Sequence, residues 1–188
     1  MTDLNGKKIA IIATDHFEEA ELVTPRDELA KAGAEVKVYS TGTDPIQAVE
    51  GDTSPTQKVD VHGTFGDLDV SSVDAVVVPG GTVNADHIRV DEDAQDIVRE
   101  ALDTDKVVAV ICHGPWLLVS AGVAKGRTLT SYPSLAIDLE NAGATWKDEE
   151  VVVDGKLITS RNPDDLDAFG AAIVEEFARS EDDEPDED

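Results

Sequence analysis

Short runs of apolar residues and longer segments with helical spacing alternate along this chain. The runs are apolar on both faces, which is typical of strands buried in a parallel sheet. The alternation predicts an α/β fold, with a doubly wound, mostly parallel sheet that carries helices on both faces. The predicted strands are residues 8–13, 35–40, 74–78 and 107–111, with edge hairpins within 46–68 and a hairpin at 151–158; the predicted helices are residues 17–32, 91–102, 134–142 and 164–178.

The turn after residues 107–111 places the only cysteine of the chain, Cys112, beside His113. Gly114 and Pro115 follow and begin a helix, so this strand-to-helix turn is of the kind that presents a nucleophile above a sheet. The partial positive charge of a helix N-terminus favours thiolate, and we expect the pKa of the Cys112 thiol to be depressed. The alternative is that Cys112 is a small buried hydrophobic residue, the commoner fate of a free cysteine.

Two further loops, residues 14–19 and 80–87, are expected to meet this turn, because open α/β folds bind ligands at the carboxyl ends of their strands. Gly80 and Gly81 allow the backbone to approach closely. Their N–H groups are predicted to form an oxyanion hole together with the amide of His113. A tight strand-to-helix turn is the alternative explanation of this glycine pair.

Glu18, at the end of the first of these loops, is expected to face Cys112. Two negative charges this close raise each other's pKa, so we expect the pair to share one proton. A protonated Glu18 would donate a hydrogen bond to the sulfur and provide an acid or base within reach. Glu19 and Glu21 are attributed to the usual preference for acidic residues in the first turn of a helix.

Length and composition predict one domain over residues 1–180, followed by an acidic, disordered tail at 181–188. The chain has no apolar run of the ~20 residues that span a bilayer, and its start lacks the basic residues of a signal peptide. We therefore expect a soluble, cytoplasmic protein. A single cysteine excludes an internal disulfide, and without CxxC or HExxH spacing no metal or cofactor is expected. His16 and His87 receive no role.

The charge balance is extreme, with 41 acidic residues against 15 basic ones and a formal net charge of −26. Such a surface repels nucleic acid and anionic membranes, so neither is expected as a partner. The acidic excess is spread along the chain, as in proteins of halophiles in which concentrated cations screen the repulsion. A haloarchaeal source is expected.

Four segments together resemble the ThiJ/PfpI superfamily, which includes the PfpI-type intracellular proteases and the parkinsonism-associated deglycase. They are residues 15–22, 77–81, 109–115 and 151–166, in the order of that superfamily's motifs. The resemblance implies a flavodoxin-like fold of the class I glutamine amidotransferase-like type. It also implies Cys112 as nucleophile, His113 as base, Glu18 as carboxyl partner and Asp86 reaching over from a neighbouring subunit. The assembly would then be a homodimer or a higher homo-oligomer, up to a hexamer.

Three functions are compatible with these residues. The first is cysteine-dependent chemistry on reactive carbonyls, as a cofactor-free glyoxalase or as a deglycase of proteins or nucleotides, in stress protection. The second is peptide hydrolysis through an acyl-enzyme. The third is a redox-sensing or chaperone-like stress protein in which Cys112 is oxidised. A glutaminase is disfavoured, because those enzymes use a late histidine and none follows His113.

Overall fold

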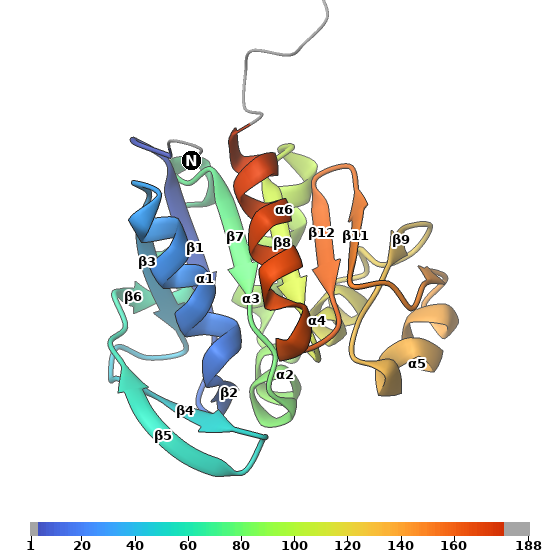
Figure 1. Ribbon diagram of the computed structural model, residues 1–188, viewed down its shortest axis with the longest axis horizontal. Helices are drawn as coiled ribbons and strands as arrows, with labels where there is room; N and C mark the ends of the chain where they lie inside the picture. The colour runs from blue at the N-terminus through green and yellow to red at the C-terminus, as the bar shows by residue number, and fades with distance from the viewer. Residues whose placement is uncertain (1–3, 179–188) are drawn as a thin grey trace, which may run out of the picture.

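The computed structural model describes residues 4–178 and has a seven-stranded sheet at its centre (Figure 1). In chain order these strands are β1 (Lys8–Ile12), β3 (Glu35–Ser40), β6 (Gly63–Thr64), β7 (Ala75–Val78), β8 (Val107–Ile111), β11 (Val151–Asp154) and β12 (Leu157–Ser160). Their spatial order is β11-β12-β8-β7-β1-β3-β6, and β11 is the one antiparallel member. The chain runs from β1 to β3 on one side and returns to β7 on the other, which creates a topological switch point at the carboxyl ends of β1 and β7.

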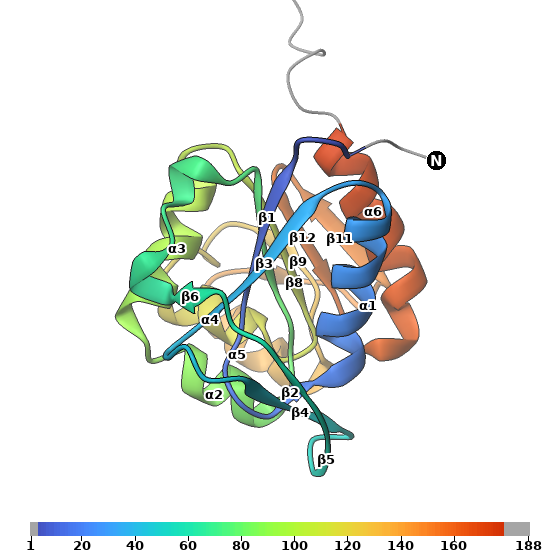
Figure 2. The same cartoon turned by 90° about the vertical axis from the view of Figure 1, so that its left-hand side faces the viewer.

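Helices cover both faces of this sheet (Figure 2). One face carries α1 (Glu19–Lys31) and α6 (Leu166–Ala178), and the other carries α3 (Glu92–Asp103) and α4 (Pro115–Ser120). Two short helices complete the set: α2 (Thr82–Ile88) packs against α4 at the carboxyl edge, and α5 (Ala136–Asn141) packs beside α4. A further small pair, β9 (Thr128–Leu129) with β10 (Thr145–Trp146), lies next to α5.

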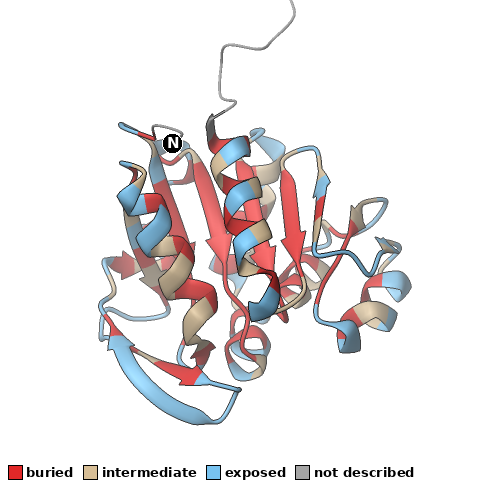
Figure 3. Ribbon diagram, viewed as in Figure 1, coloured by how far each residue is buried: buried red, intermediate tan, exposed pale blue. Residues whose placement is uncertain are grey.

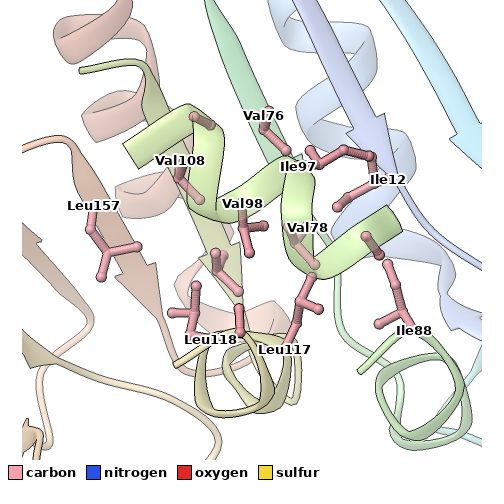
Figure 4. Packing of buried hydrophobic residues seen from close by; sticks show 14 of the residues in the cluster. Ile12, Val76, Val78, Ile88, Ile97, Val98, Val108, Leu117, Leu118 and Leu157 are labelled. Atoms are coloured by element: carbon pink, nitrogen blue, oxygen red, sulfur yellow. The ribbon is translucent and has the colours of Figure 1, made fainter. Parts of the chain in front are cut away.

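Side chains of each central strand alternate between two apolar clusters, one under each helical layer. In β1, Ile9 and Ile11 belong to the cluster that contains Leu22 of α1, whereas Ala10 and Ile12 belong to the opposite cluster. That second cluster, seen in Figure 4, joins the strands to α3 and α4. The central strands are buried on both faces (Figure 3), which explains why they are apolar throughout.

A hairpin of β4 (Ile46–Glu50) and β5 (Ser54–Val59) projects from the carboxyl edge of the main sheet (Figure 1). A two-residue strand, β2 (Phe17–Glu18), pairs with β4 and joins the hairpin to the start of α1. Most of β5 is exposed, so polar contacts rather than an apolar core hold the tip of the hairpin.

The predicted fold class is confirmed. Several element boundaries differ by one or two residues from the sequence prediction, and two of the differences affect the site. The helix expected from residue 17 begins at Glu19, because Phe17 and Glu18 pair with β4 instead. Part of the loop expected at residues 80–87 forms α2. The predicted tail at 181–188 lies outside the described residues. Within residues 4–178, no helix is long and apolar enough to cross a membrane.

Candidate active site

Cys112 occupies the predicted turn between β8 and α4 in a strained backbone conformation. Its φ of 63° is left-handed, which costs a residue with a side chain about 1–3 kcal/mol. Two backbone hydrogen bonds hold it there: the Cys112 amide donates to the Ser160 carbonyl at 3.1 Å, and the Tyr132 amide donates to the Cys112 carbonyl at 2.8 Å. Gly114 is also required, because a Cβ at this position would lie 2.7 Å from Val110 Cγ1. The surrounding backbone therefore holds Cys112, which carries the sulfur, in this strained conformation.

The carboxyl beside Cys112 belongs to Glu21, and this corrects the expectation for Glu18. Glu21 is fully buried, interacts with the Cys112 side chain, and accepts a 2.8 Å hydrogen bond at Oε2 from the Gly80 amide. Because α1 begins at Glu19, residue 21 lies in its first turn on the buried stripe of the helix. That stripe consists of Glu21, Leu22, Pro25 and Leu29.

Burial controls the protonation of this pair. It raises the pKa of the Glu21 carboxyl to about 8, more than the hydrogen bonds with Cys112 and Gly80 lower it, so Glu21 holds its proton at neutral pH. Burial also raises the pKa of the Cys112 thiol, opposite to the depression expected from sequence, and a charged Glu21 raises it further. The amides of Gly81 and His113 act in the other direction. The pair therefore carries at most one negative charge near neutral pH.

His113 lies with its Nδ1 atom 3.2 Å from Cys112 Sγ, within reach of the thiol proton. Burial lowers the pKa of the His113 imidazole, and the negative charge of Asp52 raises it. The ring stacks on Tyr132, with centroids 4.6 Å apart, and meets the edge of Trp116 at 6.0 Å. A neutral imidazole in this position can accept the proton of Cys112.

The backbone amides near the sulfur divide between two tasks. The amides of Gly81 and His113 point to Cys112, and both remain candidates for an oxyanion hole. The Gly80 amide donates instead to Glu21, so the structure corrects its predicted place in the oxyanion hole. Gly80 is needed for close approach, since a Cβ there would lie 2.5 Å from Glu21 Oε2 and 2.6 Å from Cys112 Cβ.

Glu18 binds the tip of the hairpin rather than the sulfur. Its two carboxylate oxygens accept hydrogen bonds from the amides of Gly51 and Asp52, at 3.1 and 3.3 Å. Asp52 in turn accepts a 2.7 Å hydrogen bond at Oδ1 from the amide of Thr82, the first residue of α2. The hairpin tip therefore reaches the site from outside the sheet.

The remaining predicted polar residues do not meet Cys112 within this chain. Asp86 and His87 are exposed on α2, and His16 is exposed in the loop before β2, where its amide donates to the Gln47 carbonyl at 2.7 Å. A role for Asp86 in a neighbouring subunit stays a prediction. In the part of the chain described, no group of three or more His, Cys, Asp or Glu side chains is arranged to hold a metal ion.

Residues 7–176 match the model of the DJ-1/PfpI family. The chain belongs to this family. It is 41% identical over 166 residues to "Protein/nucleic acid deglycase 2" of Escherichia coli, covering 87% of this chain and 94% of that protein. It is also 38% identical over 165 residues to YraA of Bacillus subtilis, whose name proposes a cysteine protease. That match covers 87% of this chain and 94% of YraA. The crystal structure of Drosophila melanogaster DJ-1beta superposes with a TM-score of 0.83 at 31% identity, covering 92% of this chain and 90% of that one.

Sequence reasoning within this DJ-1/PfpI chain missed three residues that the fold brings to the site: Glu21, Asp52 and Thr82. One signal could have identified Glu21: it is a carboxylate that falls on the apolar stripe of its helix, four residues before Pro25. The sequence holds no comparable signal for Asp52, because its position depends on how a distant hairpin folds over α2.

Proposed function

We propose that this chain is a cysteine-dependent enzyme that acts on small reactive carbonyls, with Cys112 as nucleophile. It would convert a 2-oxoaldehyde such as methylglyoxal into a 2-hydroxy acid, or release the same aldehyde from its adducts with amines. One observation carries the choice of substrate: Cys112 and His113 are only 6% and 7% exposed. A site this buried suits a small aldehyde better than a peptide chain.

The reaction begins when His113 Nδ1 takes the thiol proton of Cys112 and the sulfur adds to the aldehyde carbon. The amides of Gly81 and His113 stabilise the oxyanion, which then takes the proton back from His113 to give a hemithioacetal. From an amine adduct, the same attack on the carbinol carbon breaks the carbon–nitrogen bond. The free amine leaves with the thiol proton, and the same hemithioacetal remains.

His113 next moves the proton on the aldehyde carbon to the neighbouring carbon, while the hydroxyl proton passes to the oxygen of that second carbon. The hemithioacetal thereby becomes a thioester of a 2-hydroxy acid, with no net change in atoms. Water then adds to the thioester carbonyl, the carbon–sulfur bond breaks, and one water proton returns to sulfur. The neutral Glu21 carboxyl stabilises each sulfur anion without placing a second charge in the buried site.

The test is lactate production from methylglyoxal beside hydrolysis of casein or a small peptide, both in molar salt, with Cys112→Ala as the control. We expect lactate from the wild-type protein and none from Cys112→Ala. Peptidase activity is the second candidate, favoured by the name of the Bacillus subtilis relative. Peptide cleavage without lactate would replace the first proposal with the second.

A further inference from the structure

Thr82 connects the tip of the β4–β5 hairpin to His113. Its amide donates to Asp52 Oδ1 at 2.7 Å, and its Oγ1 lies 3.5 Å from His113 Nε2. The other ring nitrogen, Nδ1, lies 3.2 Å from Cys112 Sγ. The contact between Thr82 Oγ1 and His113 Nε2 is long, as catalytic hydrogen bonds often are before substrate binds. An unbroken set of polar contacts therefore runs from the hairpin tip to the sulfur.

The tip is held in place by Glu18, whose carboxylate accepts hydrogen bonds from the amides of Gly51 and Asp52. Both residues of the turn have positive φ, 60° for Gly51 and 65° for Asp52, and both are exposed. Burial does not fix this turn. Besides the pairing of Glu50 with Ser54 and the hydrogen bond from Thr53 Oγ1 to the Gly51 carbonyl, its contacts are with Glu18 on one side and Thr82 on the other.

The position of Thr82 matters because a histidine ring has two forms when it is neutral. Only the form with hydrogen on Nε2 leaves a lone pair on Nδ1, where the Cys112 proton must go. Thr82 Oγ1 is the acceptor placed for that Nε2 hydrogen. When His113 takes the proton of Cys112, the ring becomes positive, and the negative charge of Asp52 stabilises it.

We propose that Thr82 and Asp52 of the same chain are the positioning residues for His113, and that Glu18 fixes the turn that carries Asp52. Thr82 selects the Nε2–H form of the ring, and Asp52 anchors Thr82 while supplying the opposite charge. The assignment gives Glu18 a place on the histidine side of the site rather than on the sulfur side. Its consequence for catalysis rests on the proposed function, but its effect on the ring does not.

Few other charged or titratable groups face this ring. Cys112 and Glu21 lie on the Nδ1 side, the Tyr132 ring stacks on one face, and Arg89 lies beyond Trp116, with its guanidinium carbon 5.0 Å from the indole centre. Asp52 is the group whose charge favours the protonated imidazole. Removing that charge should make His113 harder to protonate.

The first experiment observes His113 by NMR of ring-labelled protein in molar salt, without any substrate. Asp52→Asn keeps an oxygen for the Thr82 amide and tolerates the positive φ, so it removes the charge with little else. We expect the His113 titration midpoint to move to lower pH in Asp52→Asn. The exposed Asp60, at the other end of β5, gives a matched control, and Asp60→Asn should leave the midpoint in place. Equal midpoints in wild type, Asp52→Asn and Asp60→Asn would overturn the role of Asp52.

The second experiment separates Thr82 from a merely structural residue. Thr82→Val keeps the shape and removes the acceptor, whereas Thr82→Ser keeps the hydroxyl. In the neutral ring, we expect Thr82→Val to shift nitrogen signals toward the Nδ1–H form and Thr82→Ser to preserve the wild-type pattern. We also expect Thr82→Val to lose about tenfold in kcat with methylglyoxal, part of the roughly 10²- to 10⁴-fold that acid–base catalysis supplies. A wild-type ring pattern in Thr82→Val would overturn the role of Thr82.

The third experiment concerns Glu18. Glu18→Ala should move the His113 midpoint in the same direction as Asp52→Asn, while Glu50→Gln, which removes an exposed charge beside the same turn, should not. An unchanged midpoint in Glu18→Ala would overturn its role. Because the NMR measurements need no substrate, an unchanged His113 midpoint or ring pattern would overturn this inference without affecting the proposed function. Absence of lactate from the wild-type protein would sink the proposed function alone.

Discussion

The Gly80 amide donates a 2.8 Å hydrogen bond to Glu21 Oε2, which holds a fully buried carboxyl against Cys112. Gly80 lies in the loop between β7 and α2, and Glu21 lies in the first turn of α1. The contact therefore joins two elements across the topological switch point. It places a neutral acid on one side of the sulfur, while Asp52 acts on His113 from the other side.

Glu21 should determine how readily Cys112 reacts near neutral pH. A protonated carboxyl donates to a thiolate, an amide donates less strongly, and an aliphatic side chain does not donate. We predict that Glu21→Leu slows alkylation of Cys112 by iodoacetamide about tenfold at pH 7, while Glu21→Gln stays within about threefold of wild type. The measurement is the alkylation rate in molar salt, with Glu50→Gln, which removes an exposed carboxylate of β4, as the control. Faster alkylation in Glu21→Leu would mean that Glu21 is the anion of the pair.

The raised pKa of Glu21 also predicts a pH dependence of stability. Its ordinary value of 4.5 rises to about 8 in the fold, so between these values the folded state holds a proton that the unfolded state has lost. The contribution of Glu21 to stability therefore falls as pH rises through this window, by up to about 1.4 kcal/mol per unit, and levels off above pH 8. Glu21→Gln lacks this slope. Urea unfolding should show that the free energy of unfolding of Glu21→Gln rises relative to that of wild type between pH 5 and 8. A constant difference between the two proteins would contradict the raised pKa.

A methyl group at Gly80 should disrupt the site directly. The Cβ of Gly80→Ala would lie 2.5 Å from Glu21 Oε2 and 2.6 Å from Cys112 Cβ, so the carboxyl or the turn at Cys112 must move. We predict a loss of about 100-fold in kcat/KM and about 1–3 kcal/mol of stability. Gly42→Ala is the control, because a Cβ at Gly42 meets no atom within 4 Å. Wild-type activity in Gly80→Ala would show that the Glu21–Cys112 contact is not needed.

The fold was predictable from sequence because each central strand is apolar on both faces, and burial in a parallel sheet leaves that signature directly in the chain. The turn at Cys112 was predictable because Gly114 and Pro115, which favour the start of a helix, follow such a strand at once. The choice between Glu18 and Glu21 depends on where α1 begins. It begins at Glu19, because Phe17 and Glu18 pair with β4 as strand β2. That pairing joins residues some 30 positions apart and has no local pattern.

The excess of acidic residues predicts a dependence on salt. At low ionic strength a net charge of −26 repels itself, and molar salt screens that repulsion within a few ångströms. We predict that the protein loses cooperative structure in dilute buffer and regains it in molar potassium chloride. Circular dichroism across a salt series is the measurement, with sucrose as a control for effects that are not ionic. Full cooperative structure in dilute buffer would remove the expectation of a halophilic origin.

Assembly can be tested by mixing inactive subunits, because Asp52 and Asp86 are proposed to act in different ways. Asp86 is exposed on α2, and the role implied by the family requires it to enter a neighbouring subunit's site. In a dimer that combines Cys112→Ala with Asp86→Asn, one site then has both changes and the other has neither. Random pairing makes half of the dimers hybrids, so about a quarter of wild-type activity should return.

Asp52 gives the matched contrast, because it contacts Thr82 of its own chain. In a hybrid of Cys112→Ala with Asp52→Ala, every site keeps the change of its own chain, so mixing should give only half the activity of Asp52→Ala alone. Activity is measured after joint unfolding and refolding, with subunit exchange confirmed by mass-labelled chains. If the Asp86→Asn mixture recovers nothing although subunits exchange, Asp86 has no role across the interface. If the Asp52→Ala mixture recovers a quarter, the acting Asp52 belongs to the neighbouring subunit and the contact with Thr82 is not the one that matters for His113.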